Sequence, residues 1–255
     1  MLRNLIFLSL FLLMSCAQQP KQNFSDLATV WQQSSAELTA LSYQAYNTAR
    51  LQLNRSLKIK SKKPLAIIVD VDETVLDNSP YQVKNIFEDR EFNQENWSEW
   101  LEVAQAPAVA GAVDFLNYAQ RNNVTTFYVT NRNNKNFEAT YKNLKAQGFP
   151  ITRNQLRPKV DPNSSKEKRR LEILKKYNVV LYIGDALGDF NKDFEKVEFG
   201  KRKEVVEKYK NDFGRSYIIL PNPMYGEWLE SIYKYDHSLS NEEKKHLRHQ
   251  ILEAY

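Results

Sequence analysis

Apolar and polar positions divide this chain into short apolar segments and longer amphipathic ones. Short runs of β-branched and other apolar residues predict five buried strands, at residues 65–69, 124–129, 156–160, 179–183 and 216–220. Apolar residues at helical spacing predict helices over residues 111–120, 136–147, 164–177 and 189–211, and two more after residue 220. Strands that alternate with helices indicate an α/β fold with a doubly wound, mostly parallel, Rossmann-like sheet.

Two segments depart from this alternation. Residues 25–57 carry apolar side chains at helical spacing, among them Leu27, Val30 and Leu53, and predict an N-terminal helical segment that packs on the body. Residues 80–108 are rich in aromatic and acidic side chains and predict a helical cap element over the site. We therefore expect one domain over residues 24–255, with the cap as an insertion.

The first 15 residues have the pattern of a secretory signal. Arg3 precedes an apolar stretch at residues 5–14, which is too short to span a bilayer. The segment ends in Leu-Met-Ser-Cys, which resembles a bacterial lipobox and predicts a signal peptide over residues 1–15 and acylation of Cys16. A polar tether over residues 16–23 would follow. An ordinary signal peptide beside an incidental cysteine is the alternative, although Cys16 is the only cysteine of the chain.

The charge of the chain is mildly positive and spread out. Lys and Arg number 36 against 31 Asp and Glu, and the formal net charge is +5. This excess does not indicate a nucleic-acid surface, but it is compatible with a small anionic substrate. Ala17 after the cysteine is not an acidic inner-membrane retention signal. We therefore expect an extracytoplasmic lipoprotein held at a membrane by its lipid, in the outer membrane if the source has two membranes.

Two carboxylates follow the first predicted strand. Asp70 and Asp72 come directly after the apolar run 65–69, and ligands of open α/β sheets bind at the carboxyl ends of the strands. Carboxylates this close repel each other unless they share a cation or a proton, and a hard divalent cation would hold both. Such a site suits phosphoryl transfer with a carboxylate as the nucleophile. A loop with scattered acids is the alternative.

Other predicted strand ends and helix starts carry suitable side chains. Thr130 and Asn131 follow the second strand, and the Thr130 hydroxyl could donate to a phosphate oxygen or only begin a turn. Lys166 lies at a predicted helix start, where it would neutralise a phosphate or belong to a solvated basic face. Asp185 and Asp189 follow the fourth strand, and Asp189 could serve only as a helix N-cap.

In this order the elements resemble the haloacid-dehalogenase (HAD) superfamily of phosphohydrolases. The segments Asp70-x-Asp72-Glu73-Thr74 and Gly184-Asp185-x-Leu187-x-Asp189 look like the paired signatures of the class C acid phosphatases. That family comprises bacterial lipoproteins and includes the outer-membrane "lipoprotein e" 5′-nucleotidases. The resemblance covers the chain from the lipobox to about Trp228. Ala186 stands where the family usually has a polar residue, which bears on hydrogen bonding beside the metal.

The resemblance implies a role for each signature aspartate. Asp70 would be the nucleophile and a metal ligand. Asp72 would protonate the leaving alcohol and then activate water, while its backbone carbonyl binds the metal. Asp185 would be the third protein ligand, and Asp189 would orient a metal-bound water. Because the ligands are hard oxygens, the expected metal is Mg²⁺.

The resemblance also implies a substrate site. Thr130 and Lys166 would hold the phosphate, with Asn131 assisting. Trp97 of the cap and Tyr225 occupy positions that resemble the aromatic pair on which the family stacks a nucleobase or nicotinamide ring. Both could instead be ordinary packing aromatics.

We therefore expect a magnesium-dependent acid phosphomonoesterase that hydrolyses 5′-nucleotides, nicotinamide mononucleotide included, through an aspartyl-phosphate. One alternative is a broad-specificity acid phosphatase without base preference, and another is a non-catalytic surface binding or adhesion lipoprotein on the same scaffold. The three histidines all lie in the C-terminal tail, at residues 237, 246 and 249, which disfavours a histidine-phosphate mechanism. The sequence is also compatible with a homodimer.

Overall fold

The computed structural model describes residues 26–161 and 165–255. The predicted signal peptide, Cys16 and the tether lie outside the described residues. Within the described residues, no helix is both long enough and apolar enough to cross a membrane.

A five-stranded sheet forms the centre of the molecule, in the order β3-β2-β1-β4-β5. Its strands are β1 (Leu65–Val69), β2 (Thr125–Asn133), β3 (Leu156–Lys159), β4 (Asn178–Gly184) and β5 (Tyr217–Ile219). Every neighbouring pair is parallel. The predicted doubly wound parallel sheet is confirmed, and its first strand lies in the middle, where the order of the chain reverses direction.

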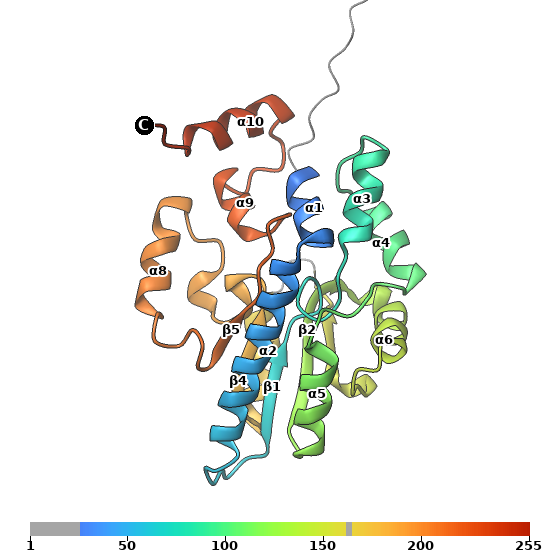
Figure 1. Cartoon of the computed structure of the whole chain (residues 1–255), viewed down its shortest axis with the longest axis vertical. Coiled ribbons are helices and arrows are strands. Elements are labelled where there is room, and N and C mark those ends of the chain that lie inside the picture. Colours follow the sequence, from blue (N-terminus) through green and yellow to red (C-terminus); the bar gives the residue numbers. More distant parts are fainter. Residues whose placement is uncertain (1–25, 162–164) are drawn as a thin grey trace, which may run out of the picture.

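Both faces of the sheet are buried, because successive side chains of a strand point to opposite faces. Ile67 and Val69 of β1 belong to the larger apolar core, which α2 (Ala36–Ser56) and α5 (Ala112–Arg121) cover (Figure 1). Ala66 and Ile68 pack on the other face with Ile173 of α7 (Lys166–Lys176). A strand buried on both sides explains the uninterrupted apolar run that precedes Asp70.

The predicted N-terminal helical segment forms two helices. Helix α1 (Asp26–Ser34) precedes α2, and the Ser35 side chain caps α2 by accepting the Leu38 N–H at 3.2 Å. Leu53 is fully buried in the core. The expectation that Leu27 and Val30 pack on the body is wrong, since they are 76% and 51% exposed.

The reason lies in the neighbour of α1. This helix lies against α3 (Ser79–Phe87), and its buried side carries Thr29 and Gln32. Its apolar side therefore faces outward, and helical periodicity alone does not report which side of a helix is covered.

The predicted cap residues form two helices, α3 and α4 (Gln94–Val103). Pro80 lies in the first turn of α3, and the Asn93 side chain caps α4 by accepting the N–H groups of Glu95 and Asn96. Figure 1 places both helices above the end of the sheet toward which β1 runs. They therefore stand beside the edge that carries the predicted site.

The remaining helices follow the expected alternation except in one segment. They are α6 (Phe137–Ala146), α8 (Arg202–Lys208), α9 (Glu227–Ile232) and α10 (Asn241–Gln250). The helix predicted over residues 189–211 is wrong: the segment contains short 3-10 turns, and only α8 is α-helical. Lys196 has a φ of +54°, which ends any regular helix, and Phe190 and Phe194 pack against β5 as a separate small cluster.

Candidate active site

The predicted polar residues meet at the carboxyl edge of the sheet. Asp70 follows β1 and still donates its N–H to Ile183 O of β4 at 2.9 Å, so the ladder fixes its backbone. Thr130 lies in β2, and Asp185 follows β4. Because neighbouring parallel strands end at the same side of a sheet, residues far apart in the chain become neighbours here.

Three carboxylates form a compact cluster at this edge. One oxygen from each of Asp70, Asp185 and Asp189 lies within 4.8 Å of the other two. Gly184 makes this possible, because a Cβ there would meet Asp189 Oδ2 at 2.2 Å. The Ala186 N–H donates to the same oxygen at 3.0 Å. The backbone N–H of residue 186 therefore makes a hydrogen bond beside the carboxylate cluster. This bond does not depend on the side chain, so the unusual alanine does not remove it.

Lys166 places its charge within this cluster. Its Nζ lies 2.5 Å from Asp70 Oδ1 and 2.5 Å from Asp189 Oδ1. Ser165 starts α7 by accepting the Glu167 N–H at 3.1 Å, which aims the first residue of the helix at the sheet edge. Burial lowers the pKa of Lys166, but Asp189 and Asp70 more than offset it, so the ammonium stays charged.

The alternative of a solvated basic face at the start of α7 is wrong. Lys166, Arg169 and Arg170 are buried, and only Lys168 of this group is exposed. Arg169 donates to Thr130 O of β2 and to Arg157 O of β3, and Arg170 donates to Gly188 O in the loop after β4. These cations tie α7 to the strand ends that carry the site.

Burial sets the protonation of the acidic cluster. It raises the pKa of Asp185 to about 7, helped by Asp189, while hydrogen bonds from Asn222 and Thr74 work in the opposite direction. Asn222 Nδ2 donates to Asp185 Oδ2 at 2.9 Å, and Thr74 Oγ1 donates to Asp185 Oδ1 at 3.1 Å. Burial also raises the pKa of Asp70 well above its usual range, against the opposing effect of Lys166. Buried like charges of this kind mark a place where a cation would bind.

Asp72 points its carboxylate away from this cluster. Arg132 donates to Asp72 Oδ1 from Nη2 at 2.8 Å and from Nε at 2.9 Å. Asn78 Nδ2 donates to the same oxygen at 2.9 Å, and Thr130 Oγ1 donates to Asp72 Oδ2 at 3.3 Å. The side chain is thus separate from the candidate cation ligands, in keeping with different roles for the two signature aspartates.

Thr130 and Asn131 differ in exposure. Thr130 is fully buried, and its hydroxyl accepts the Arg132 N–H at 3.0 Å in addition to its bond with Asp72. Asn131 is exposed, and its Oδ1 accepts a hydrogen bond from Arg169 Nη2 at 3.2 Å. Both therefore lie at the correct strand end, and Thr130 is already engaged by its neighbours.

The two predicted aromatic residues flank the edge from different elements. Trp97 of α4 packs edge-on against Tyr81 of α3, with ring centroids 5.0 Å apart. Tyr225 follows β5, and its N–H donates a long hydrogen bond of 3.4 Å to Asn222 Oδ1. Because Asn222 also donates to Asp185, it connects the loop of Tyr225 to the carboxylate cluster. Within the described residues, no ring contact joins Trp97 to Tyr225.

Sequence reasoning missed Arg132, Asn78 and Asn222 as members of this site. Two sequence signals could have found two of them. Arg132 is a charged residue directly after the strand end at Thr130 and Asn131, and Asn222 lies between two prolines in a turn after the last strand. Their partners could not be read, because these depend on which side chains the fold brings together.

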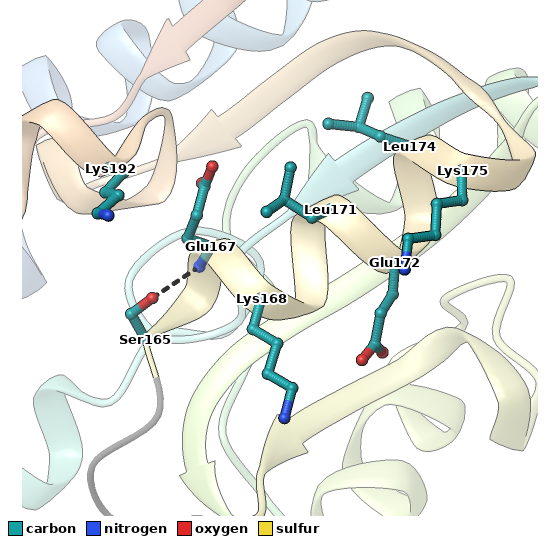
Figure 2. A pocket seen from close by; sticks show the side chains of 8 residues that line it. All are labelled: Ser165, Glu167, Lys168, Leu171, Glu172, Leu174, Lys175 and Lys192. Atoms are coloured by element: carbon teal, nitrogen blue, oxygen red, sulfur yellow. Dashed lines mark hydrogen bonds between the residues drawn. The ribbon is translucent and has the colours of Figure 1, made fainter.

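A groove on α7 lies apart from this cluster. Its lining residues are Ser165, Glu167, Lys168, Leu171, Glu172, Leu174, Lys175 and Lys192 (Figure 2). No strand-end carboxylate lines it, and its charges are of both signs. The strand edge and not this groove is therefore the candidate active site.

Comparisons with known proteins agree with this geometry. The family described as HAD superfamily, subfamily IIIB (acid phosphatase), matches residues 13–228. The class C acid phosphatase from Bacillus anthracis, solved with tungstate bound, has a TM-score of 0.88 and 37% identity, covering 91% of this chain and 97% of that chain. A second structure of the Bacillus anthracis enzyme has a TM-score of 0.87, 38% identity and the same coverage.

Plant proteins are more distant relatives. The stem 31 kDa glycoprotein of Glycine max is 30% identical over 165 residues, which are 62% of this chain and 58% of the relative. Acid phosphatase 1 of Solanum lycopersicum is 29% identical over 82 residues, 32% of each chain. The matches thus span about three fifths of the first relative and a third of the second.

The chain belongs to the HAD superfamily, subfamily IIIB, a family of acid phosphatases that are phosphomonoesterases.

The raised pKa of Asp185 predicts how stability depends on pH without added metal. Between its ordinary value of 3.8 and about 7, the folded protein keeps a proton that the unfolded chain has lost. Stability from this group is therefore lost as pH rises through that window. We expect Asp185→Asn to flatten the fall of Tm between about pH 4 and pH 7, whereas Asp114→Asn, at an exposed carboxylate of α5, leaves the slope unchanged. Equal slopes for wild type and Asp185→Asn would contradict the assignment.

Proposed function

We propose that this chain is a magnesium-dependent acid phosphomonoesterase that works through an aspartyl-phosphate on Asp70. The observation that carries the proposal is the contact of Lys166 with Asp70 and Asp189 inside a buried carboxylate cluster. The oxygens of Asp70, Asp185 and Asp189 fit a hard divalent cation, which would screen the charge of the anionic ester. Tungstate, bound by the Bacillus anthracis relative, is a tetrahedral oxyanion like phosphate.

The residues of the chain account for both halves of the reaction. In the first half, a carboxylate oxygen of Asp70 forms a bond to phosphorus while the bond from phosphorus to the leaving oxygen breaks, and Asp72 gives its proton to that oxygen. In the second half, Asp72 takes a proton from water, and the resulting hydroxide displaces the Asp70 carboxylate from phosphorus. Phosphate leaves, and both aspartates return to their starting states. Lys166 offsets the negative charge of the phosphoryl group.

The first test is phosphate release by the chain lacking residues 1–16. We expect hydrolysis of 5′-AMP, nicotinamide mononucleotide and p-nitrophenyl phosphate with Mg²⁺, and loss of turnover with EDTA that added Mg²⁺ restores. Asp70→Asn should abolish turnover, because the amide cannot attack phosphorus. Turnover by Asp70→Asn equal to wild type would refute the mechanism. Nucleotide binding without any turnover would support the non-catalytic binding protein instead.

We further propose that 5′-nucleotides are the preferred substrates, nicotinamide mononucleotide included. Trp97 is only partly buried and lies on the cap beside the sheet edge, so part of its ring is accessible for stacking. Stacking contributes roughly 1–3 kcal/mol per base and tolerates different rings. A broad-specificity acid phosphatase without base preference is the competing function.

Replacing Trp97 by alanine separates these two functions. For stacking, we expect kcat/KM for 5′-AMP to fall about tenfold or more, which corresponds to the energy of one stacked base, and that for p-nitrophenyl phosphate to change little. Phe87→Ala, at an 83% exposed aromatic of the same cap, is the matched control. Equal losses on both substrates would favour the broad-specificity enzyme.

We also propose that the mature chain is held at an extracytoplasmic membrane surface by a lipid on Cys16. The support is the lipobox-like segment Leu13-Met14-Ser15-Cys16 after a short apolar stretch. Cys16→Ser should prevent incorporation of labelled palmitate and release the protein from the membrane fraction of an expressing bacterium. Unchanged labelling would show that Cys16 is not the lipid site, and solubility of the wild type would refute the anchor.

A further inference from the structure

We propose that Arg132 is a positioning residue that occupies Asp72 Oδ1 and leaves Oδ2 as the oxygen that exchanges the proton. This inference rests on the proposed function, and it assigns a task to a buried cation that the mechanism above does not use. It identifies which of the two oxygens of the Asp72 carboxylate exchanges the proton.

The two oxygens of Asp72 have unequal surroundings. Asp72 Oδ1 accepts three N–H bonds, from Arg132 Nε at 2.9 Å, from Arg132 Nη2 at 2.8 Å and from Asn78 Nδ2 at 2.9 Å. Among the described residues, Asp72 Oδ2 accepts only one long bond of 3.3 Å, from the Thr130 hydroxyl. A carboxylate oxygen offers about two lone-pair sites, so Oδ1 is saturated and Oδ2 has room for a proton.

Thr130 is a partner that can adapt to this proton. Its hydroxyl already accepts the Arg132 N–H at 3.0 Å, and a hydroxyl hydrogen rotates to suit its surroundings. It can therefore donate to an ionised Oδ2 and turn away when Oδ2 is protonated. The N–H donors at Oδ1 cannot turn away in this manner, because a guanidinium always presents its hydrogens.

Arg132 is itself held in place from several sides. Its side chain is 1% exposed, Nη1 donates to Thr140 Oγ1 at 3.3 Å, and Nη2 donates also to Asn78 Oδ1 at 3.2 Å. Its guanidinium carbon lies 5.9 Å from the centre of the Trp97 ring. A planar donor group fixed in this way holds Asp72 Oδ1 with two N–H groups of defined direction, which the freely rotating ammonium of a lysine could not do.

The cap contributes to the same arrangement. Asn78 precedes α3, and its Oδ1 accepts a hydrogen bond from Trp100 Nε1 of α4 at 2.9 Å. The network Asp72–Asn78–Trp100 therefore connects the proposed proton donor to α4, the helix that carries Trp97. One network of hydrogen bonds therefore holds both the cap helix beside the site and the carboxylate of Asp72.

The proton steps follow from this asymmetry. Oδ2–H of Asp72 gives its proton to the leaving oxygen as the bond from phosphorus to that oxygen breaks, and the same Oδ2 later takes a proton from the attacking water. Throughout the cycle Oδ1 keeps its three donors. Loss of Arg132 should therefore harm reactions that need the proton and spare those that do not.

The test compares leaving groups in Arg132→Lys and Arg132→Ala. An alkyl phosphate such as β-glycerophosphate releases a poor leaving group that must be protonated, whereas p-nitrophenyl phosphate releases a stable phenolate. We compare kcat/KM, which reports the steps through formation of the phosphoryl-enzyme and leaves out its later hydrolysis. For Arg132→Ala we expect a fall of about 10²-fold or more on β-glycerophosphate, the size of a general-acid contribution, and a much smaller fall on p-nitrophenyl phosphate. Arg132→Lys should lie between wild type and Arg132→Ala.

A matched control separates positioning from folding. Arg170 is also a buried arginine of the site region, but it contacts Glu167, Glu195 and Gly188 and not Asp72. Arg170→Lys should leave the ratio of the two kcat/KM values unchanged, and melting curves identify any variant that fails to fold. Added guanidinium should restore the alkyl phosphate activity of Arg132→Ala if its pocket stays intact.

Each outcome decides the proposal. Equal losses on both substrates, or a changed ratio in Arg170→Lys as well, would assign Arg132 a structural role and overturn the inference. Unchanged kinetics in Arg132→Ala would overturn it too. A wild-type protein that hydrolyses neither substrate would refute the proposed function, and the inference with it, which is a different result from an active wild type whose ratio does not respond to Arg132.

Discussion

The contact of Lys166 with Asp70 and Asp189 is the constraint on which the rest of this site depends. A parallel sheet that ends in several buried carboxylates would collect negative charge without compensation, and burial makes such charge costly. One ammonium at the start of α7, 2.5 Å from an oxygen of each aspartate, offsets part of it. The position of α7, its Ser165 cap and the glycine at residue 184 all serve to let these three side chains meet.

The candidate site consists of two regions along the same edge. Asp70, Asp185 and Asp189 gather on the side of β4 and α7, where oxygens and one cation face each other. Asp72 lies on the side of β2 and the cap, where Arg132, Asn78 and Thr130 surround it. Two carboxylates only two residues apart thus have different environments, and the proposed roles of nucleophile and acid need such a difference.

The parallel sheet and the gathering of the strand-end residues could be predicted from sequence, because apolar runs mark buried strands and parallel strands end at one side. What could not be predicted depends on contacts between side chains. The burial of Lys166 and Arg169 could not be read from a stretch rich in Lys and Arg, and the exposed side of α1 depends on α3. The helix predicted over residues 189–211 failed because aromatic packing around Phe190 and a left-handed Lys196 override local periodicity.

The distances along the chain between the members of the site have a consequence for biogenesis. Lys166 lies 96 residues from Asp70 in sequence, and Thr74 lies 111 residues from its partner Asp185. Contacts of such long range form only after the intervening chain has closed a large loop, which makes them late events in folding. A chain that is still being synthesised therefore has no assembled centre, so the enzyme stays inactive toward phosphate esters until the strands that carry these residues have joined in one sheet.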